Sequence, residues 1–252
     1  MERYQGRVAV VTGVSSGIGE GLVRALVAAG IRVAGCARNA DKLQTLKESL
    51  GSNSEHFLPV TCDLTEEQQV RNFFERVLAE WGAVDILINN AGLAFNSSLL
   101  DGTVEEWRTM LDTNIVALCL CTQLTVESMK ESNISDGYII HINSESGHMH
   151  PVPSKFHFYS ATKHAVRALT ETMRLELAKT LPGCRISSVS PGLVETQFLA
   201  KMAGRPAEQL KVFSRMKALE VEDVVQTVLH LLRTPAHVQV HDVLMRPAGQ
   251  TS

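Results

Sequence analysis

The stretch "RVAVVTGVSSGIGEGL", residues 7–22, carries the strongest indication of the fold in this sequence. Its first part is a short apolar run typical of a buried strand. Three glycines spaced G-x-x-x-G-x-G then lead directly into a segment of helical period. A tight turn from strand to helix needs glycine, and the N–H groups at the start of a helix bind anions such as a pyrophosphate. The stretch therefore predicts a dinucleotide-binding turn at Gly13, Gly17 and Gly19.

The same alternation of short apolar runs and longer helical segments continues along the chain. It predicts an α/β fold of the Rossmann type, in which a doubly wound, parallel, seven-stranded sheet is flanked by helices on both faces. The predicted strands are residues 7–12, 31–37, 57–62, 84–89, 138–143, 185–190 and 242–246, and the predicted helices are 17–29, 40–50, 66–81, 104–131, 156–180 and 221–233.

One connection is much longer than the few residues that usually join a strand to a helix. It covers residues 191–223, in a chain of 252 residues that has no repeat and no linker of the kind that separates domains. We expect a single domain, 1–252, with a substrate-lid insertion at about 193–220; a surface helix packed on the core is the alternative. The apolar residues at partly helical spacing there are Phe198, Leu199, Met202, Leu210, Phe213 and Met216.

The composition is that of a folded protein without a nucleic-acid partner. The net charge of -3 provides no basic excess that would attract a phosphate backbone. The first apolar run is too short for a signal peptide, and we find no run long enough to span a bilayer. The five cysteines are odd in number and lie mostly in apolar segments, which is typical of reduced thiols. We expect a cytoplasmic protein without an integral membrane segment.

The end of the second predicted strand distinguishes between the two nicotinamide dinucleotides. An NAD site usually offers a carboxylate there to the ribose 2′-hydroxyl, whereas this chain has Ala37 and then Arg38. A guanidinium at this position pairs well with the 2′-phosphate of NADP, although a solvated surface arginine is the alternative. The sequence therefore favours NADP(H) as the cofactor.

A tyrosine and a lysine stand four residues apart in "YSATK", residues 159–163, with only small residues between them. This spacing places Tyr159 and Lys163 on one face of a helix. Such pairs also occur by chance on amphipathic helices, so the pair needs the context of the other motifs.

Five motifs in order supply that context: "TGVSSGIG", "NNAG" at 89–92, "NSESG" at 143–147, "YSATK" and "SPGLVET" at 190–196. With them the chain resembles the short-chain dehydrogenase/reductase family, in its compact single-domain branch, over nearly its whole length. Within that family, "GAVDILINNAGLA" and the ending "TPAHVQVHDVLMRP" are similar to the animal farnesol dehydrogenases and the 17β-hydroxysteroid dehydrogenase-like members, including the mammalian family member eleven.

The resemblance implies four catalytic residues. Tyr159 would exchange a proton with the substrate oxygen, and Lys163, together with an oxidised nicotinamide, would lower the pKa of that phenol toward the working range. Ser144 would orient the substrate oxygen, with Ser146 as the competing candidate, and Asn114 would hold a water in a proton relay. Taken singly, such Ser and Asn residues are more often structural.

The resemblance also implies a set of residues that contact the cofactor. One of them, Asn90, could equally form a purely structural hydrogen bond at the end of a strand. The implied residues are Gly13, Ser15, Ser16, Gly17, Ile18, Gly19, Arg38, Asp63, Leu64, Asn90, Ala91, Gly92, Tyr159, Lys163, Pro191, Gly192, Val194 and Thr196.

The substrate expected from the resemblance is a small lipophilic alcohol or carbonyl compound, such as a farnesol-like terpenoid or a steroid ketone. The candidate pocket wall is Phe95, Met149, Val152, Phe198, Met202 and Phe213. A general carbonyl or dicarbonyl reductase, and an NADPH-sensing protein without chemistry, are the alternatives.

Several charged or titratable residues near these motifs have less specific roles. We expect no metal at His148, His150 and His157, because their spacing lacks a helical i,i+4 pair. We expect His148, His150 and Pro151 to line the substrate mouth or to be solvated, and Glu145 to turn to solvent. The resemblance further implies a homodimer or homotetramer, paired through the helices at 104–131 and 156–180.

Overall fold

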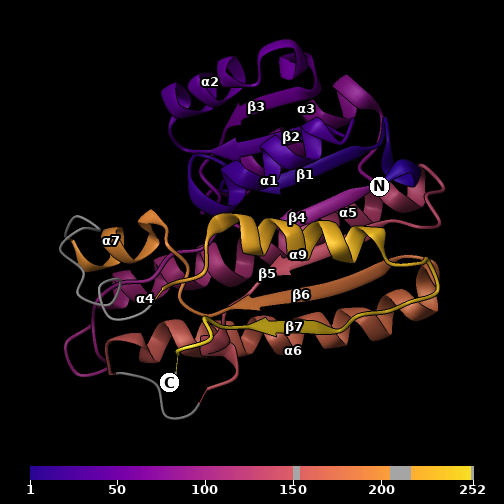
Figure 1. The fold of residues 1–252 in the computed structure, drawn as a ribbon. Coiled ribbons are helices and arrows are strands. Elements are labelled where there is room, and N and C mark those ends of the chain that lie inside the picture. The colour runs from indigo at the N-terminus through magenta and orange to yellow at the C-terminus, as the bar shows by residue number, and fades with distance from the viewer. Residues whose placement is uncertain (150–153, 205–216, 251–252) are drawn as a thin grey trace.

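The computed structural model describes residues 1–149, 154–204 and 217–250. Its centre is one sheet of seven strands in the order β3-β2-β1-β4-β5-β6-β7, with every neighbouring pair parallel (Figure 1). The chain moves outward from β1 to β3 and then restarts on the other side of β1 with β4. The carboxyl ends of β1 and β4 therefore form the crevice at which open α/β sheets bind ligands.

The seven predicted strands are confirmed, with ends that differ by at most two residues. The strands are β1 (Val8–Thr12), β2 (Arg32–Ala37), β3 (Phe57–Thr61), β4 (Ile86–Asn89), β5 (Tyr138–Ile142), β6 (Arg185–Pro191) and β7 (Asp242–Met245).

The predicted helices also form, but the segment 104–131 is not a uniform α-helix. One turn of π-helix, Asp112–Val116, separates its two α-helical parts. The helices are α1 (Gly17–Ala28), α2 (Ala40–Ser49), α3 (Glu67–Trp81), α4 (Val104–Leu111), α5 (Ala117–Glu131), α6 (His157–Thr180), α7 (Gln197–Ala203) and α9 (Val221–Arg233), with short 3₁₀ helices at Glu2–Tyr4, Gly51–His56, Glu145–Gly147 and Ser154–Phe156.

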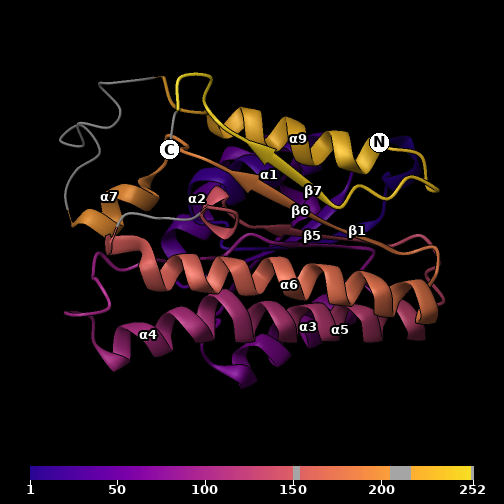
Figure 2. The ribbon, with the colours of Figure 1, turned by 90° about the horizontal axis from the view of Figure 1, so that it is seen from below.

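Helices cover both faces of the sheet, which explains why the strands read as continuous apolar runs (Figure 2). In β1, Ala9 and Val11 face a core formed with α1, α2 and α9, whereas Val8 and Val10 face a second core formed with α3, α5 and α6. The predicted doubly wound architecture is therefore confirmed.

The combined helix Val104–Glu131 is long and apolar enough to cross a membrane by length and composition, which the sequence analysis did not find. Its buried residues, including Cys121 and Met129, pack in the core on the sheet. A core helix of this kind passes the same test, so length and composition here are weak evidence for a membrane span.

The long connection after β6 has its two ends held together. Val194 and Leu219 form a parallel bridge, in which the N–H of Glu195 donates to the carbonyl of Leu219 at 2.8 Å and the N–H of Leu219 donates to that of Leu193 at 2.9 Å. Helix α7 follows Thr196 and lies at the carboxyl edge of the sheet (Figure 1). The predicted apolar positions Leu210, Phe213 and Met216 lie outside the described residues.

Hydrogen bonds join the carboxyl ends of β1 and β4. The Nδ2 of Asn90 donates to the carbonyls of Thr12 and Gly13 at 2.9 and 3.1 Å. In return the hydroxyl oxygen of Thr12 accepts from the N–H groups of Asn90 and Ala91 at 3.1 and 3.0 Å. This clamp fixes the glycine turn against the next strand.

Removal of the clamp should destabilise the protein. In Asn90→Ala the carbonyls of Thr12 and Gly13 lose their donor, and we expect the free energy of unfolding to fall by about 1–3 kcal/mol. Urea denaturation would measure this change in the free energy of unfolding. Asn72→Ala is the matched control, because Asn72 is exposed on α3 and its change should stay within about 0.5 kcal/mol. Equal values for the two variants would contradict the clamp.

Candidate functional site

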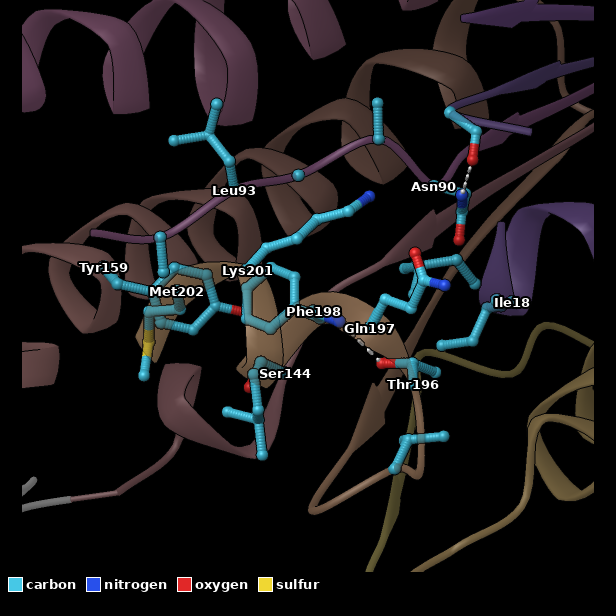
Figure 3. A pocket seen from close by; sticks show the side chains of 18 of the residues that line it. Ile18, Asn90, Leu93, Ser144, Tyr159, Thr196, Gln197, Phe198, Lys201 and Met202 are labelled. Carbon is cyan, nitrogen blue, oxygen red and sulfur yellow. Dashed lines mark hydrogen bonds between the residues drawn. The ribbon is translucent and has the colours of Figure 1, made fainter. Parts of the chain in front are cut away.

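A deep pocket lies at the carboxyl ends of the strands, with a cavity volume of about 950 Å³ (Figure 3). Eighteen of the twenty predicted site residues line this pocket. They belong to the glycine turn, the ends of β2 to β6, helix α6 and the segment that leads into α7, and Gly19 and Asn114 are the two that do not line it.

The glycine turn has the shape that a bound dinucleotide requires. Gly13 and Gly17 adopt φ values of +72° and +60°, and a Cβ at Gly13 would come within 2.9 Å of the Cα of Ala91. Helix α1 starts at Gly17 with its N-terminus at the pocket, where Ser15, Ser16 and Ile18 also lie. Exposed N–H groups and the absence of side chains let a pyrophosphate approach the main chain, so these residues fit a nicotinamide dinucleotide.

Gly19 and Asn114 support the pocket from behind. A Cβ at Gly19 would collide with the carbonyl oxygen of Gly13, so this glycine allows α1 to pack against the turn. Asn114, in the π-helical turn, accepts from the N–H of Leu93 at 2.9 Å and donates to the carbonyl of Leu93 at 2.9 Å and to Thr162 at 3.1 Å. The amide of Asn114 thus holds the pocket segment that follows β4.

The end of β2 presents a cation to the pocket, as the sequence predicts. Arg38 lines the cavity, and so do Asp63 and Leu64 at the end of β3. The carboxylate of Asp63 accepts from the N–H and the hydroxyl of Thr65, at 3.0 and 2.8 Å. No ion pair between described residues involves Arg38, so its guanidinium can bind a ligand in the pocket.

Tyr159 and Lys163 both lie in the pocket on one face of α6, and both are almost fully buried, at 7% and 4% exposure. The Nζ of Lys163 is 5.7 Å from the centroid of the Tyr159 ring and donates to the carbonyl of Ile142 at 3.0 Å. The spacing of four residues in "YSATK" therefore does bring the phenol and the ammonium together.

Burial dominates the titration of this pair. It raises the pKa of Tyr159 to about 12, whereas a hydrogen bond with Ser144 acts to lower it and the carboxylate of Glu145 acts to raise it. Burial lowers the pKa of Lys163 to about 8. We expected Lys163, together with an oxidised nicotinamide, to bring the pKa of the phenol toward neutral pH. In the chain by itself burial has the largest effect and raises that pKa, so the lowering stays a prediction for the complex with the nicotinamide.

The structure distinguishes between the two candidate serines. Ser144 hydrogen-bonds Tyr159, and its hydroxyl oxygen also accepts from the N–H of Ser146 at 3.1 Å. Ser146 lines the pocket as well, but its carbonyl accepts from Ser160 at 2.6 Å, which ties this turn to α6. Ser144, rather than Ser146, is therefore the serine whose hydroxyl bonds the phenol of Tyr159.

The expectation for Glu145 is wrong. Its side chain is only 12% exposed and forms an ion pair with Arg246, whose Nε lies 2.6 Å from its Oε2. Gln250 donates to the other oxygen and accepts from the N–H of Leu193 at 3.2 Å. The segment after β7 folds back over the site and supplies both partners, which are more than 100 residues away in the sequence and gave no local signal.

The expectation for His148 is also wrong. It does not line the pocket but lies behind it, with its Nε2 3.1 Å from the hydroxyl of Ser190 and 3.6 Å from Asp242. His150 and Pro151 lie outside the described residues, and His157 begins α6. Within the described ranges, no three His, Cys, Asp or Glu side chains gather as a metal site requires.

The part of the pocket next to Tyr159 is apolar. The rings of Tyr159 and Phe198 lie 5.7 Å apart, and Met202 packs in the same cluster (Figure 3). Of the other predicted wall residues, Met149 lines the pocket and Phe95 packs in the cluster without lining it, whereas Val152 and Phe213 lie outside the described part of the chain. Helix α7 therefore covers the phenol with an apolar surface.

Sequence reasoning missed several residues that line the pocket. Some of these residues flank a predicted motif, and Gln197, Lys201 and Gln250 come from α7 and the C-terminal segment. The missed lining residues include Leu93, Ala94, Thr113, Phe156, Gln197, Lys201 and Gln250. Adjacency to "NNAG" could have indicated Leu93 and Ala94; nothing in the local sequence marks Lys201 or Gln250.

Comparisons with known proteins agree with this geometry. Residues 7–207 match the short chain dehydrogenase family. The dehydrogenase/reductase SDR family member 11 of Mus musculus is 45% identical, covering 100% of this chain and 98% of that protein. The farnesol dehydrogenase of Aedes aegypti is 40% identical and covers 99% of both chains. A closed form of serine dehydrogenase complexed with NADP+ superimposes with a TM-score of 0.88 at 32% identity, covering 97% of this chain and 96% of that one.

A family match over most of the chain and relatives of this identity over full length leave no competing fold or family. The chain belongs to the short-chain dehydrogenase/reductase family of oxidoreductases.

Proposed function

We propose that this oxidoreductase is an NADP(H)-dependent short-chain alcohol dehydrogenase and carbonyl reductase acting on a lipophilic alcohol or carbonyl compound. The observation that carries the proposal is the buried phenol of Tyr159, which meets the hydroxyl of Ser144 and the ammonium of Lys163 inside a pocket with a dinucleotide-binding turn. This set of groups can deliver a proton to a carbonyl oxygen bound in the pocket.

When bound, the nicotinamide cofactor supplies or accepts the hydride. Tyr159 gives its proton to the substrate oxygen in reduction and takes it back in oxidation, while Ser144 orients that oxygen. Lys163 would hold the nicotinamide ribose and return protons to the phenol, and Asn114 would support this relay. A phenol that stays protonated at neutral pH, as the buried Tyr159 does, suits the reductive direction.

The remaining pocket residues hold the cofactor along its length. Arg38 supports NADP(H) over NAD(H), because its guanidinium lies in the pocket where a carboxylate would select the ribose 2′-hydroxyl. The NADP+ complex of the serine dehydrogenase is consistent with this choice. Asp63 and Leu64 would flank the adenine, Asn90, Ala91 and Gly92 the adjoining ribose, and Pro191, Gly192, Val194 and Thr196 the nicotinamide.

The apolar wall supports a lipophilic substrate. Phe198, Met202 and Met149 leave few polar groups for a hydrophilic ligand, and Met side chains adapt to several shapes. The farnesol dehydrogenase relative makes a farnesol-like terpenoid a first candidate, with a steroid ketone as the second. We propose that the insertion at 193–220 is a substrate lid on a single domain.

We also propose a cytoplasmic homodimer or homotetramer. All five cysteines are free thiols, which suits a reducing compartment. The outer faces of the helices at 104–131 and 156–180 expose large apolar side chains, namely Val104, Leu111, Val116 and Leu175, which a second copy of the chain could cover.

Replacement of the phenol tests the central role. Tyr159→Phe removes the proton donor but keeps the ring on Phe198, so we expect kcat to fall by about 10²–10⁴-fold while NADPH binding persists. The assay follows NADPH absorbance with farnesal, steroid ketones and small dicarbonyls. Tyr138→Phe is the matched control, because Tyr138 is buried outside the pocket and bonds Ser187. Near-normal turnover in Tyr159→Phe would refute the mechanism; turnover with small dicarbonyls alone would indicate a general carbonyl reductase.

Reversal of the charge at Arg38 tests the cofactor. In Arg38→Asp the carboxylate repels a 2′-phosphate and can accept from a 2′-hydroxyl, so we expect the ratio of kcat/KM for NADPH over NADH to fall by about 10²-fold or more. Arg76→Asp makes the same charge change on the exposed face of α3 and should leave the ratio unchanged. An unaltered ratio in Arg38→Asp would remove Arg38 from the phosphate site.

The raised pKa of Tyr159 predicts the pH dependence of both directions. Reduction needs the protonated phenol, which is present below its pKa and lost above it, whereas oxidation needs the phenolate. We therefore expect kcat/KM for alcohol oxidation to rise from neutral into alkaline pH. Glu145→Gln removes a charge that raises this pKa, so the profile should shift to lower pH by about half a unit.

The partner of Glu145 gives the opposite test. Arg246→Ala removes the ion-pair partner of the carboxylate next to Tyr159, and the oxidation profile should shift to higher pH. Glu176→Gln, on the exposed face of α6, serves as control and should not move the profile. Shifts of the same sign in Glu145→Gln and Arg246→Ala would contradict an electrostatic effect on the phenol.

A further inference from the structure

Helix α7 contributes a cation that none of the sequence motifs contains. Lys201 lines the same pocket as Arg38 and the glycine turn. In Figure 3 its side chain runs over the pocket, away from Tyr159 and in the direction of Asn90, whereas Phe198 and Met202 of the same helix face Tyr159. Helix α7 thus presents an apolar surface to the end of the pocket that holds Tyr159, and the ammonium of Lys201 to the other end, toward Asn90.

Arg38 and Lys201 are two of the cations that line the pocket. Partial burial lowers the pKa of Lys201, and the charges of Lys42 on α2 and Arg38 after β2 lower it further. Like charges repel, so a folded chain gains nothing by gathering them unless an anion joins them. Arg38 and Lys201 come from opposite sides of the pocket, one from the end of β2 and the other from the insertion after β6.

Within the described ranges, no carboxylate forms an ion pair with these cations. The ion pairs among the described residues include none with Arg38, Lys42 or Lys201. Of the two described carboxylates that line the pocket, Asp63 accepts two hydrogen bonds from Thr65 and Glu145 pairs with Arg246. Arg38 and Lys201 can therefore bind a ligand with concentrated negative charge.

We propose that Lys201 binds a phosphate group of the dinucleotide from the lid side of the pocket, opposite Arg38. This inference rests on the proposed cofactor site and adds a residue to it. The 2′-phosphate is the favoured group, because Arg38 and Lys42 share the region and a dianionic phosphate monoester matches several cations. The pyrophosphate, which NADPH and NADH have in common, is the other source of the same chemistry.

The proposal couples cofactor binding to the position of α7, the first helix of the insertion. Because α7 also carries Phe198 against the Tyr159 ring, a phosphate held by Lys201 fixes the helix that forms the apolar wall. Cofactor binding and the shape of the substrate site are then coupled through one short helix.

The test is a set of dissociation constants measured by calorimetry, which needs no turnover. The variants are Lys201→Ala, Lys201→Arg and, as matched control, Lys179→Ala, whose lysine is exposed on α6 away from the pocket. The ligands are NADPH, NADH, 2′,5′-ADP and 5′-ADP. We expect Lys201→Ala to weaken NADPH and 2′,5′-ADP by about tenfold at low salt, and Lys201→Arg to restore most of that affinity.

The other outcomes distinguish the 2′-phosphate from the pyrophosphate, and an effect of charge from an effect of packing. Equal weakening of NADPH and NADH, with 5′-ADP following, would support the pyrophosphate as the group that Lys201 binds. Unchanged dissociation constants for all four ligands would overturn the proposal, and so would a loss that Lys201→Arg does not restore, because that result marks a packing effect in α7. If the wild-type protein preferred NADH, the NADP assignment would fail on its own, and the Lys201 variants would still report on the pyrophosphate.

Discussion

The clamp between the carboxyl ends of β1 and β4 is the constraint on which the site depends. Asn90 donates to the carbonyls of Thr12 and Gly13, and Thr12 accepts from the main chain of the β4 end in return. These bonds hold a turn with positive φ at Gly13 so close to Ala91 that a side chain would not fit. The open main chain at the start of α1 follows from this contact, and the pocket is built on it.

Burial has the largest effect on the pKa values of Tyr159 and Lys163 in the pocket. The phenol of Tyr159 and the ammonium of Lys163 are both buried, so each is pushed toward its neutral form. Glu145 would add an unpaired charge beside them, but Arg246 and Gln250 return from the C-terminal segment to bond it. The site thus combines an acid that keeps its proton at neutral pH with a carboxylate held by partners that are remote in sequence.

The sequence predicted what depends on local pattern and missed what depends on the tertiary fold. Period and turn chemistry were enough for all seven strands, and the spacing of "YSATK" was enough to pair Tyr159 with Lys163. The sequence indicated Asn114 as a site residue but not its hydrogen bonds to Leu93, 21 residues away, which form in a π-helical turn that has no sequence signal of its own. The surroundings of Glu145, His148 and Lys201 could not be predicted because they come from β7, the C-terminal segment and α7. Burial of the phenol, which raises its pKa in the chain by itself, is likewise a property of the packed pocket.

Transfer of a labelled hydride tests the account most directly. The protein would be incubated with NADPH carrying deuterium at both C4 positions of the nicotinamide and with farnesal or a steroid ketone, and the product alcohol would be examined by mass spectrometry. The account predicts one deuterium on the carbon that bears the new hydroxyl, and formation of that deuterated product about 10²–10⁴-fold more slowly in the Tyr159→Phe variant. Tight NADPH binding with no deuterium in any product would contradict it and would favour a protein that senses the dinucleotide without reacting.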